Sequence, residues 1–433
     1  MSNSKIVPEG YMTRIIDAQI KRYLSLFGAV ELAGPKWCGK TWSAMANAAS
    51  ISYVDQGDNI DIATADPSLM LLGDTPHVID EWQHVPKIWD TVRHAVDNAH
   101  GKKGLWILTG SSTPHKDEVM HSGAGRIGRI RMQTMSLAES GNSTGQVSLQ
   151  GLFAGSFASC KVDVDMRGLV ELACRGGWPE TVAFTADDAQ MIVREYLKSI
   201  YEQSVPQLGK SSDTAERLVA SLARNLGQAA TLETLGKDTL GKTDDHERVI
   251  ASGRTIAAYL EMLASLFLID NIKGWAPPAR SPQRVQVKEK RYFADPSIAV
   301  AALGMSAESL LRDWQTFGLV FENLCMRDIQ VYARGLNNVS NNPVRYYRDD
   351  SGLEVDAIVE RADGSWGAFE IKTSEARVQE GVDVLLRLRD KLQKNPRERM
   401  REPSFLAVIV GIAEYARTTP EGVHVIPIRA LGA

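Results

Sequence analysis

The sequence lacks the features that mark a secreted or membrane protein. It has only four cysteines in 433 residues, and none of them forms a CxxC pair. Scattered cysteines argue against a disulfide framework and against structural zinc, and they favour a reducing compartment. No apolar run approaches the roughly 18 residues of a membrane-spanning helix, and the N-terminus has no apolar signal segment. We therefore expect a cytoplasmic protein with no membrane partner.

The chain also has little net charge, and it is long for a single hydrophobic core. A formal net charge of −4 gives no overall attraction to nucleic acid, so any DNA binding must come from local basic segments. A length of 433 residues predicts about two to four domains.

A segment near the N-terminus has the spacing of a phosphate-binding loop. Residues 34–41 read GPKWCGKT and fit G-x-x-x-x-G-K-[ST] at each fixed position. A strand-like run (28–33) precedes the loop and a helical run (40–50) follows it, which is the context of a true P-loop. In such loops backbone N–H groups and a lysine bind the phosphates, and a hydroxyl binds Mg²⁺. We predict that ATP is contacted by Gly34, Pro35, Lys36, Trp37, Cys38, Gly39, Lys40, Thr41 and Trp42.

The segment PHVIDEWQ (76–83) supplies two acids at the end of a short apolar strand. We predict that Asp80 binds Mg²⁺ together with Thr41, and that Glu81 orients the attacking water. These acids and Lys40 form the predicted catalytic centre.

A second apolar strand, GLWILTGSS (104–112), ends in small polar residues. We expect Ser111 or Ser112 to sense the γ-phosphate, and we place Ser111 in the catalytic set. A strand followed by an ordinary turn is the alternative for this segment.

Phosphoryl transfer also needs a cation near the developing negative charge. The segment GAGRIGRIRM (123–132) offers Arg126, Arg129 and Arg131. The last two alternate in a strand-like run and have an ordinary role as solvated or paired residues. Arg126 follows two glycines in a loop, so we predict that it is an arginine finger. It could act in cis or be supplied by a neighbouring subunit. A finger from a neighbouring subunit would imply a homo-oligomer that forms a ring.

Several separated motifs together resemble the prokaryotic AAA-type ATPases whose C-terminal half is a domain of unknown function related to restriction-endonuclease folds. The matching segments are GPKWCGKT, IDEWQHVP, LTGSS, GAGR with SLAE, CRGGWPE, RYFADPSIA, GLVFENL, and LEVDAIV with FEIK. They extend over about residues 10–375, which is most of the chain.

The resemblance implies an α/β protein in three parts, with ATP and Mg²⁺ as ligands. The first is a P-loop NTPase domain of the AAA type with a parallel sheet (1–165). A helical lid with a winged-helix module follows (166–300). The last is an α/β domain like the PD-(D/E)xK restriction endonucleases (301–433).

The middle of the chain has the element order of a winged helix-turn-helix. Apolar spacing predicts helices at 213–226, 231–240 and 252–272, the last running into a strand. Family members look similar here, but the third helix carries few charges, whereas a major-groove helix normally presents several basic or amide side chains. We therefore favour a structural lid or interaction module over base reading.

Two basic segments could contact DNA phosphates. The first, ARSPQRVQVKEKR (279–291), would be the wing, with Arg280, Arg284, Lys288, Lys290 and Arg291 against a single acid. The second, LLRLRDKLQKNPRERMRE (385–402), is expected to be a helix that runs into a loop. A solvated surface is the alternative for each segment.

Near the C-terminus, two alternating runs (353–360 and 366–373) flank Asp363-Gly364, which is a hairpin turn signal. The two-residue period would bring Asp356, Glu370 and Lys372 side by side.

Two carboxylates, Asp356 and Glu370, can hold Mg²⁺ while Lys372 polarises an attacking water. This is the D…ExK pattern of PD-(D/E)xK nucleases, and Glu322 in GLVFENL lies where those enzymes often add a helical acid. A solvated hairpin face with cross-strand Glu–Lys pairs is the alternative.

Three functions remain open at this point. The first is an ATP-hydrolysing protein that binds DNA and remodels or processes it. The second is an ATP-driven switch that binds protein partners and has an inactive nuclease-like domain. The third is an ATP-regulated, Mg²⁺-dependent nuclease.

Overall fold

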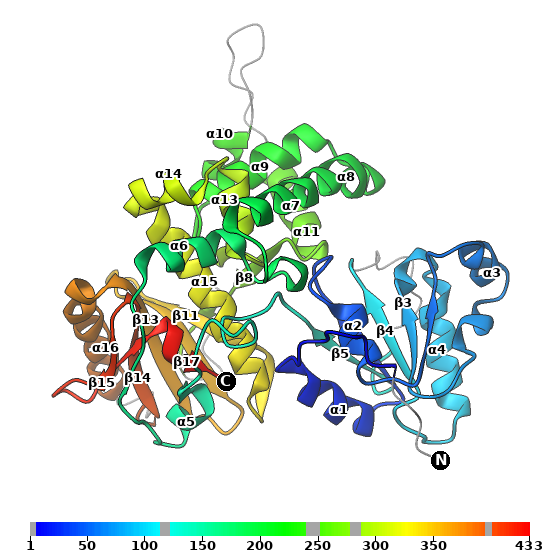
Figure 1. Cartoon of the computed structure of the whole chain (residues 1–433), viewed down its shortest axis with the longest axis horizontal. Helices are drawn as coiled ribbons and strands as arrows, with labels where there is room; N and C mark the ends of the chain where they lie inside the picture. Colours follow the sequence, from blue (N-terminus) through cyan, green and yellow to red (C-terminus); the bar gives the residue numbers. More distant parts are fainter. Residues whose placement is uncertain (1–5, 113–121, 240–251, 278–286, 395–400) are drawn as a thin grey trace, which may run out of the picture. The chain divides into compact units, whose positions relative to one another are not determined.

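A computed structural model describes residues 6–112, 122–239, 252–277, 287–394 and 401–433 (Figure 1). The chain forms two compact units. The N-terminal unit comprises Met1–Thr134, Trp178–Glu180 and Ser265–Leu268, and the C-terminal unit contains the remainder. Within the described ranges, no helix has both the length and the apolar character needed to cross a membrane.

The N-terminal unit is built on a five-stranded parallel sheet with the order β2-β3-β4-β1-β5. Its strands are β1 (Ala29–Ala33), β2 (Ser50–Tyr53), β3 (His77–Asp80), β4 (Trp106–Gly110) and β5 (Ile127–Arg131). Its helices are α1 (Ile16–Leu26), α2 (Lys40–Met45), α3 (Asn59–Ala65) and α4 (Lys87–Asn98). The expected order of strand, glycine loop and helix is confirmed, and so are the strands that precede Glu81 and Ser111.

Helix α2 is shorter than its sequence suggested. It ends at Met45, whereas the apolar run predicted a helix to residue 50. The chain leaves the helix because the backbone N–H of Ala49 donates to the carbonyl of Pro76, which starts the pairing of β2 with β3. Tertiary pairing has therefore overridden local helix propensity.

The C-terminal unit joins a group of helices to an eight-stranded mixed sheet with the order β7-β15-β16-β14-β13-β12-β11-β9. Its helices are α5 (Leu149–Phe153), α6 (Met166–Arg175), α7 (Ala186–Ser199), α8 (Val205–Gln207), α9 (Ser212–Arg224), α10 (Leu232–Thr239), α11 (Gly253–Ser265), α13 (Pro296–Ala302), α14 (Ala307–Arg312), α15 (Trp314–Gly335) and α16 (Val378–Gln393). The strands of the large sheet are β7 (Cys160–Lys161), β9 (Gly274–Trp275), β11 (Val339–Arg348), β12 (Glu354–Arg361), β13 (Trp366–Ser374), β14 (Phe405–Ile412), β15 (Tyr415–Thr418) and β16 (His424–Pro427). Two short pairs complete the unit, β8 (Ile269–Ile272) with β10 (Lys290–Phe293) and β6 (Val147–Ser148) with β17 (Leu431–Gly432).

The predicted elements of the middle region are present. Helices α9, α10 and α11 follow one another, and β8 then pairs antiparallel with β10. This is the order that a winged helix requires, but residues 279–286, the greater part of the proposed wing (279–291), lie outside the described residues. The winged-helix assignment therefore stays a prediction.

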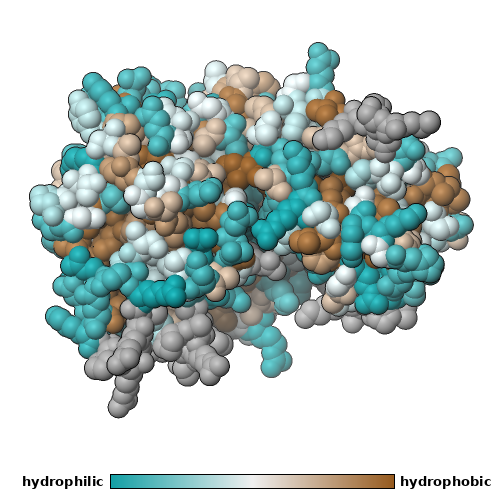
Figure 2. Space-filling model, turned by 90° about the horizontal axis from the view of Figure 1, so that it is seen from below, coloured by the Kyte–Doolittle hydropathy of each residue, from teal (hydrophilic) through white to brown (hydrophobic). Residues whose placement is uncertain are grey.

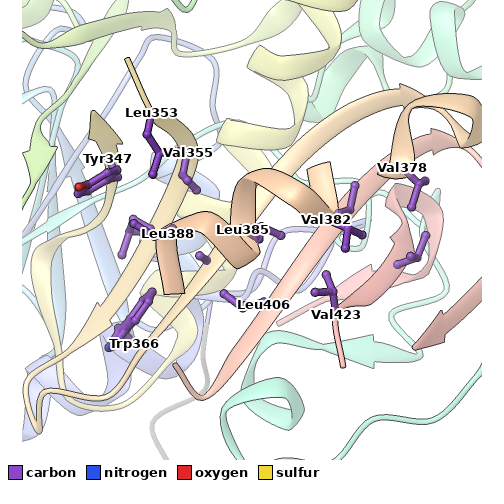
Figure 3. Packing of buried hydrophobic residues seen from close by; sticks show 14 of the residues in the cluster. Tyr347, Leu353, Val355, Trp366, Val378, Val382, Leu385, Leu388, Leu406 and Val423 are labelled. Carbon is purple, nitrogen blue, oxygen red and sulfur yellow. The ribbon is translucent and has the colours of Figure 1, made fainter. Parts of the chain in front are cut away.

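The large sheet packs against α16 through a buried apolar layer. Val382, Leu385 and Leu388 recur along one side of α16 at helical spacing, and they contact apolar residues of β12 and β14 (Figure 3). The predicted hairpin is confirmed, since β12 and β13 pair antiparallel around Asp363-Gly364.

Buried ion pairs fasten the helical region to the C-terminal region. The side chain of Arg327 in α15 is 2% exposed, and its guanidinium lies 3.1 Å from Asp295 and 2.7 Å from Asp328. Both acids are fully buried. The RYFADPSIA motif thus supplies Asp295 as a partner for α15, and the regions predicted as two separate parts lie in one compact unit.

The same acids also hold two loops through their backbones. The N–H of Gly177 donates to Asp295 over 2.9 Å, and the N–H of Leu137 donates to Asp328 over 3.1 Å. These residues belong to the CRGGWPE and SLAE motifs. Three motifs distant in sequence therefore join Arg327 and Asp328 of α15 in one buried network.

On the face seen in Figure 2, hydrophilic and hydrophobic residues are intermixed. Scattered apolar residues of this kind are ordinary on soluble domains.

Candidate nucleotide site and a second carboxylate cluster

The P-loop connects β1 to α2 at the carboxyl edge of the parallel sheet. Its close packing explains the first glycine, because a Cβ on Gly34 would lie 2.4 Å from the carbonyl oxygen of Met132. Gly39 has φ of +95°, a conformation that L side chains rarely adopt. The loop is thus a backbone surface, which is what phosphate binding needs.

Lys40 has a buried ammonium group that points into this loop. Its Nζ donates to the carbonyl oxygens of Gly34 at 3.1 Å and Pro35 at 2.8 Å. Both acceptors are neutral, so they orient the ammonium without cancelling its charge. The donor set therefore fits the phosphate groups of a nucleotide.

A residue that the sequence analysis overlooked supports the loop from behind. Arg14 is buried and donates through one Nη to the carbonyl of Cys38 at 2.9 Å and through the other to the carbonyl of Gln133 at 2.8 Å. Arg14 lies just before α1, and its backbone N–H donates a hydrogen bond to the carboxylate of Asp17 in that helix. No motif spacing marks Arg14, because its partners are 24 and 119 residues away.

Thr41 and Asp80 meet at the start of α2. The Thr41 hydroxyl donates to Asp80 Oδ1 over 2.8 Å, and the Thr109 hydroxyl of β4 donates to the same oxygen. Burial raises the pKa of Asp80, while the hydrogen bonds from Thr109 and Thr41 oppose that rise. A hydroxyl beside a carboxylate at the end of a P-loop is the oxygen set that Mg²⁺ prefers.

Glu81 directly follows β3 and has a left-handed backbone with φ of 55°. This conformation is uncommon for a residue other than glycine and is found frequently at functional sites. The Ser111 hydroxyl donates to Glu81 Oε2 over 2.9 Å, and the Gln83 amide donates to the same oxygen and to Ser111. The structure therefore brings Glu81 and Ser111 together and adds Gln83, which the sequence analysis did not include.

Arg126 lies at the wrong edge of the sheet to act in cis. It precedes β5, whose Ile127 is paired with Ala29 at the start of β1, whereas the P-loop follows the far end of that strand. Five strand residues separate the two edges by about 16 Å. The Arg126 guanidinium instead pairs with Asp97 over 2.9 Å. The cis prediction is wrong, and action from a neighbouring subunit stays a prediction.

The sheet register puts a different arginine beside the loop. Arg131 ends β5 and is paired with Ala33, the residue before Gly34, and its guanidinium lies over the ring of Phe267. Arg129 pairs with buried Glu31 over 3.1 Å and lies over the Trp89 ring, which is the ordinary role expected for it.

In the C-terminal unit, the four predicted nuclease residues divide into two groups. Lys372 Nζ lies 2.7 Å from Glu370 Oε2 in β13. Asp356 accepts the N–H of Ile371 at 2.9 Å, which places it next to that pair. Burial and then the charge of Asp356 raise the pKa of Glu370 well above its ordinary value.

Glu322 lies on the opposite flank of Asp356. It projects from α15 and accepts a hydrogen bond of 2.6 Å from the Tyr292 hydroxyl. Burial, followed by the charge of Asp356, raises the pKa of Glu322 to about 7. The three acids are therefore neighbours, as the sequence predicted.

Lys290 is the unexpected member of this cluster. The sequence predicts this lysine in a DNA-contacting wing, and that prediction is wrong because the Lys290 side chain is only 4% exposed. Its Nζ lies 2.7 Å from Glu354, 3.5 Å from Glu322 and 3.7 Å from Asp356. Across the described ranges, no group of three or more His, Cys, Asp or Glu side chains has the placement to hold a metal ion.

Two cations of the second basic segment form ion pairs. Lys391 of α16 lies 2.5 Å from Asp349, and Arg389 lies 3.0 Å from Asp390. Residues 395–400 lie outside the described residues. Contact of this segment with DNA stays a prediction.

Comparison with known proteins gives the class of each region. Residues 27–141 match a family model described as an AAA domain. Residues 166–309 and 317–431 match two models described as domains of unknown function, DUF8612 and DUF4143. The chain thus carries an AAA-type P-loop ATPase domain followed by two domains of unknown function. The relation of the last domain to nucleases stays a prediction.

Solved structures show only distant similarity. A Walker-type ATPase of Pyrococcus abyssi is 13% identical with a TM-score of 0.42, and the alignment covers 69% of this chain and 97% of that one. A RuvB variant of Thermotoga maritima is 15% identical with a TM-score of 0.28, covering 64% and 90%. The ORC1 protein of Aeropyrum pernix in complex with DNA is 12% identical with a TM-score of 0.26, covering 69% and 93%. A search of curated proteins found no match.

Proposed function

We propose that the N-terminal unit binds and hydrolyses ATP. The observation that carries this proposal is the meeting of Lys40, Thr41, Asp80 and Glu81 at the carboxyl edge of one parallel sheet, where the P-loop backbone lies. The match of residues 27–141 to an AAA domain supports it.

Each residue has a role that follows from its position. The P-loop N–H groups and Lys40 bind the β- and γ-phosphates and offset their charge. Thr41 and Asp80 would hold Mg²⁺, which supplies further neutralisation of the transferring phosphoryl group when bound. The Thr109 hydroxyl keeps Asp80 in position through its hydrogen bond.

Glu81 is the residue proposed to orient and deprotonate the attacking water. Its Oε2 is held by Ser111 and Gln83, which fixes the direction of the carboxylate. Ser111 also donates a hydrogen bond to Glu81. If Ser111 moves when the γ-phosphate binds or leaves, the Glu81 carboxylate would therefore move with it. This is a physical route for the sensing role predicted for Ser111.

Replacing Ser111 by alanine is expected to lower kcat about tenfold with KM for ATP little changed. The reason is that the variant removes one of the two hydrogen bonds that orient the Glu81 carboxylate but leaves the phosphate-binding groups intact. Steady-state hydrolysis by Ser111→Ala and Ser112→Ala measures the difference. Equal losses in the two variants, or a loss confined to Ser112→Ala, would contradict the assignment of Ser111.

The proposed ATPase activity itself is tested with Lys40→Ala. We expect loss of nucleotide binding in a fluorescent-nucleotide titration and hydrolysis at background, because the cation that faces the phosphates is gone. Lys87→Ala, an exposed lysine at the start of α4, is the matched control and should retain both activities. If Lys40→Ala still hydrolyses ATP at the wild-type rate, the site lies elsewhere.

We also propose, from the sequence, that the protein binds DNA and uses ATP hydrolysis to remodel or process it. The same assay with single-stranded, duplex and branched DNA at low salt tests it, since phosphate contacts weaken with salt. Stimulation of hydrolysis supports a DNA-directed ATPase. If DNA neither binds nor stimulates, an ATP-driven switch for protein partners is favoured.

A further inference from the structure

The C-terminal unit contains a buried cation–carboxylate cluster that ATP hydrolysis does not use. Its centre is the Lys290 ammonium of β10, which faces three carboxylates from two elements, Glu322 of α15 and both Glu354 and Asp356 of β12. Strand β10 precedes α15 in the chain and β12 follows it, so the cluster joins segments that are distant in sequence.

The remaining contacts of the cluster occupy further carboxylate oxygens. The Tyr292 hydroxyl occupies one oxygen of Glu322, and a Cβ on Gly227 would lie only 3.0 Å from that oxygen. The Lys290 ammonium lies 5.4 Å from the centre of the Tyr346 ring, which closes another side. The second oxygen of Asp356 is taken by the N–H of Ile371.

The charges of the cluster are nearly balanced by the protein itself. Four carboxylates, those of Glu322, Glu354, Asp356 and Glu370, face three cations, Lys290, Lys372 and Arg348. If all are ionised, the net charge is −1. A catalytic Mg²⁺ needs near-octahedral oxygen ligands at about 2.0–2.1 Å. The Lys290 ammonium already lies 3.5 Å from Glu322 and 3.7 Å from Asp356, two of the predicted nuclease acids, and its charge opposes a second cation beside them.

We propose that Lys290 takes the place of the divalent cation. The predicted nuclease site then binds no metal ion, and the Lys290 ammonium offsets the negative charge of its acids. The residues present therefore do not fit a bound Mg²⁺, and no cleavage step is assigned to them. Asp356 of the D…ExK pattern faces Lys290 together with Glu322 and Glu354, and Lys290 thereby fastens β10 to α15 and β12. This inference is independent of the proposed ATPase activity, which uses residues of the other unit.

The test is Mn²⁺ binding by the full-length protein without nucleotide, measured by calorimetry and by the electron paramagnetic resonance of free Mn²⁺. Wild type and Asp356→Asn are expected to bind the same amount of Mn²⁺, since any ion at the P-loop is common to both. Lys290→Met removes the ammonium but keeps the length of the side chain. It should gain one Mn²⁺ per chain, and the double variant Lys290→Met/Asp356→Asn should lose it.

Two results would overturn the proposal. One is a Mn²⁺ ion in wild type that Asp356→Asn or Glu370→Gln abolishes. The other is a folded Lys290→Met protein that gains no ion. Should Lys290→Met fail to fold, the comparison of wild type with Asp356→Asn still decides. Incubation of wild type and Asp356→Asn with Mg²⁺ and supercoiled DNA adds a second readout, in which nicking by wild type alone would also refute the inference.

Discussion

Replacing Glu81 by glutamine is expected to lower the rate of ATP hydrolysis by about 100-fold or more while leaving ATP binding intact. General-base catalysis typically contributes about 10²–10⁴-fold. Glutamine keeps the volume of the side chain and can still accept the hydrogen bond of Ser111, but it cannot take a proton. Because Lys40 and Thr41 are untouched, the variant should lose kcat and not affinity.

The measurement is kcat by phosphate release, together with the dissociation constant for a fluorescent ATP analogue. Glu9→Gln, an exposed residue of the same unit, is the matched control and should behave as wild type. A Glu81→Gln protein that hydrolyses ATP within a few-fold of wild type would show that another group positions the water.

Removal of the Arg327 side-chain charge is expected to destabilise the C-terminal unit by roughly 3–5 kcal/mol, the range measured when one partner of a buried ion pair is removed. In Arg327→Met, the two fully buried acids Asp295 and Asp328 would lose their shared cation. The acids could then shed their charge only by binding protons. The loops held by their oxygens, at Gly177 and Leu137, would lose order with them.

Denaturant-induced unfolding of the C-terminal unit measures its free energy of unfolding and hence this destabilisation. Arg312→Met is the control, because Arg312 is 78% exposed where it pairs with Glu308, and exposed pairs contribute about 0–1 kcal/mol. Arg327→Lys should fall between them, since lysine keeps the charge but not the planar fork that bonds both acids. Equal stability of Arg327→Met and Arg312→Met would show that the buried network does not hold the unit together.

Much of the N-terminal unit could be predicted from local sequence. The P-loop residues are contiguous, and the strands before Glu81 and Ser111 are short apolar runs bounded by polar residues. Gly34 and Gly39 occupy the two fixed glycine positions of the G-x-x-x-x-G-K-[ST] pattern. The hairpin of β12 and β13 was equally readable, because Asp363-Gly364 is a local turn signal.

The errors came from residues whose roles depend on distant partners. Arg126 looked like a finger because it follows glycines, but strand register, which local periodicity cannot fix, puts it at the opposite edge of the sheet from the P-loop. Gln83 and Arg14 escaped notice because their contacts, with Ser111 and with Cys38, join separate segments.

Lys290 shows most clearly what tertiary structure decided. In sequence it is one of several basic residues in a polar stretch, which is typical of a solvated loop. In the fold it is almost fully buried among Glu322, Glu354 and Asp356. The sequence by itself determined which residues form a phosphate loop, since that chemistry depends on neighbours along the chain. Only the tertiary structure decided which cation meets which acid, because a charge is buried only where distant segments converge to pair it.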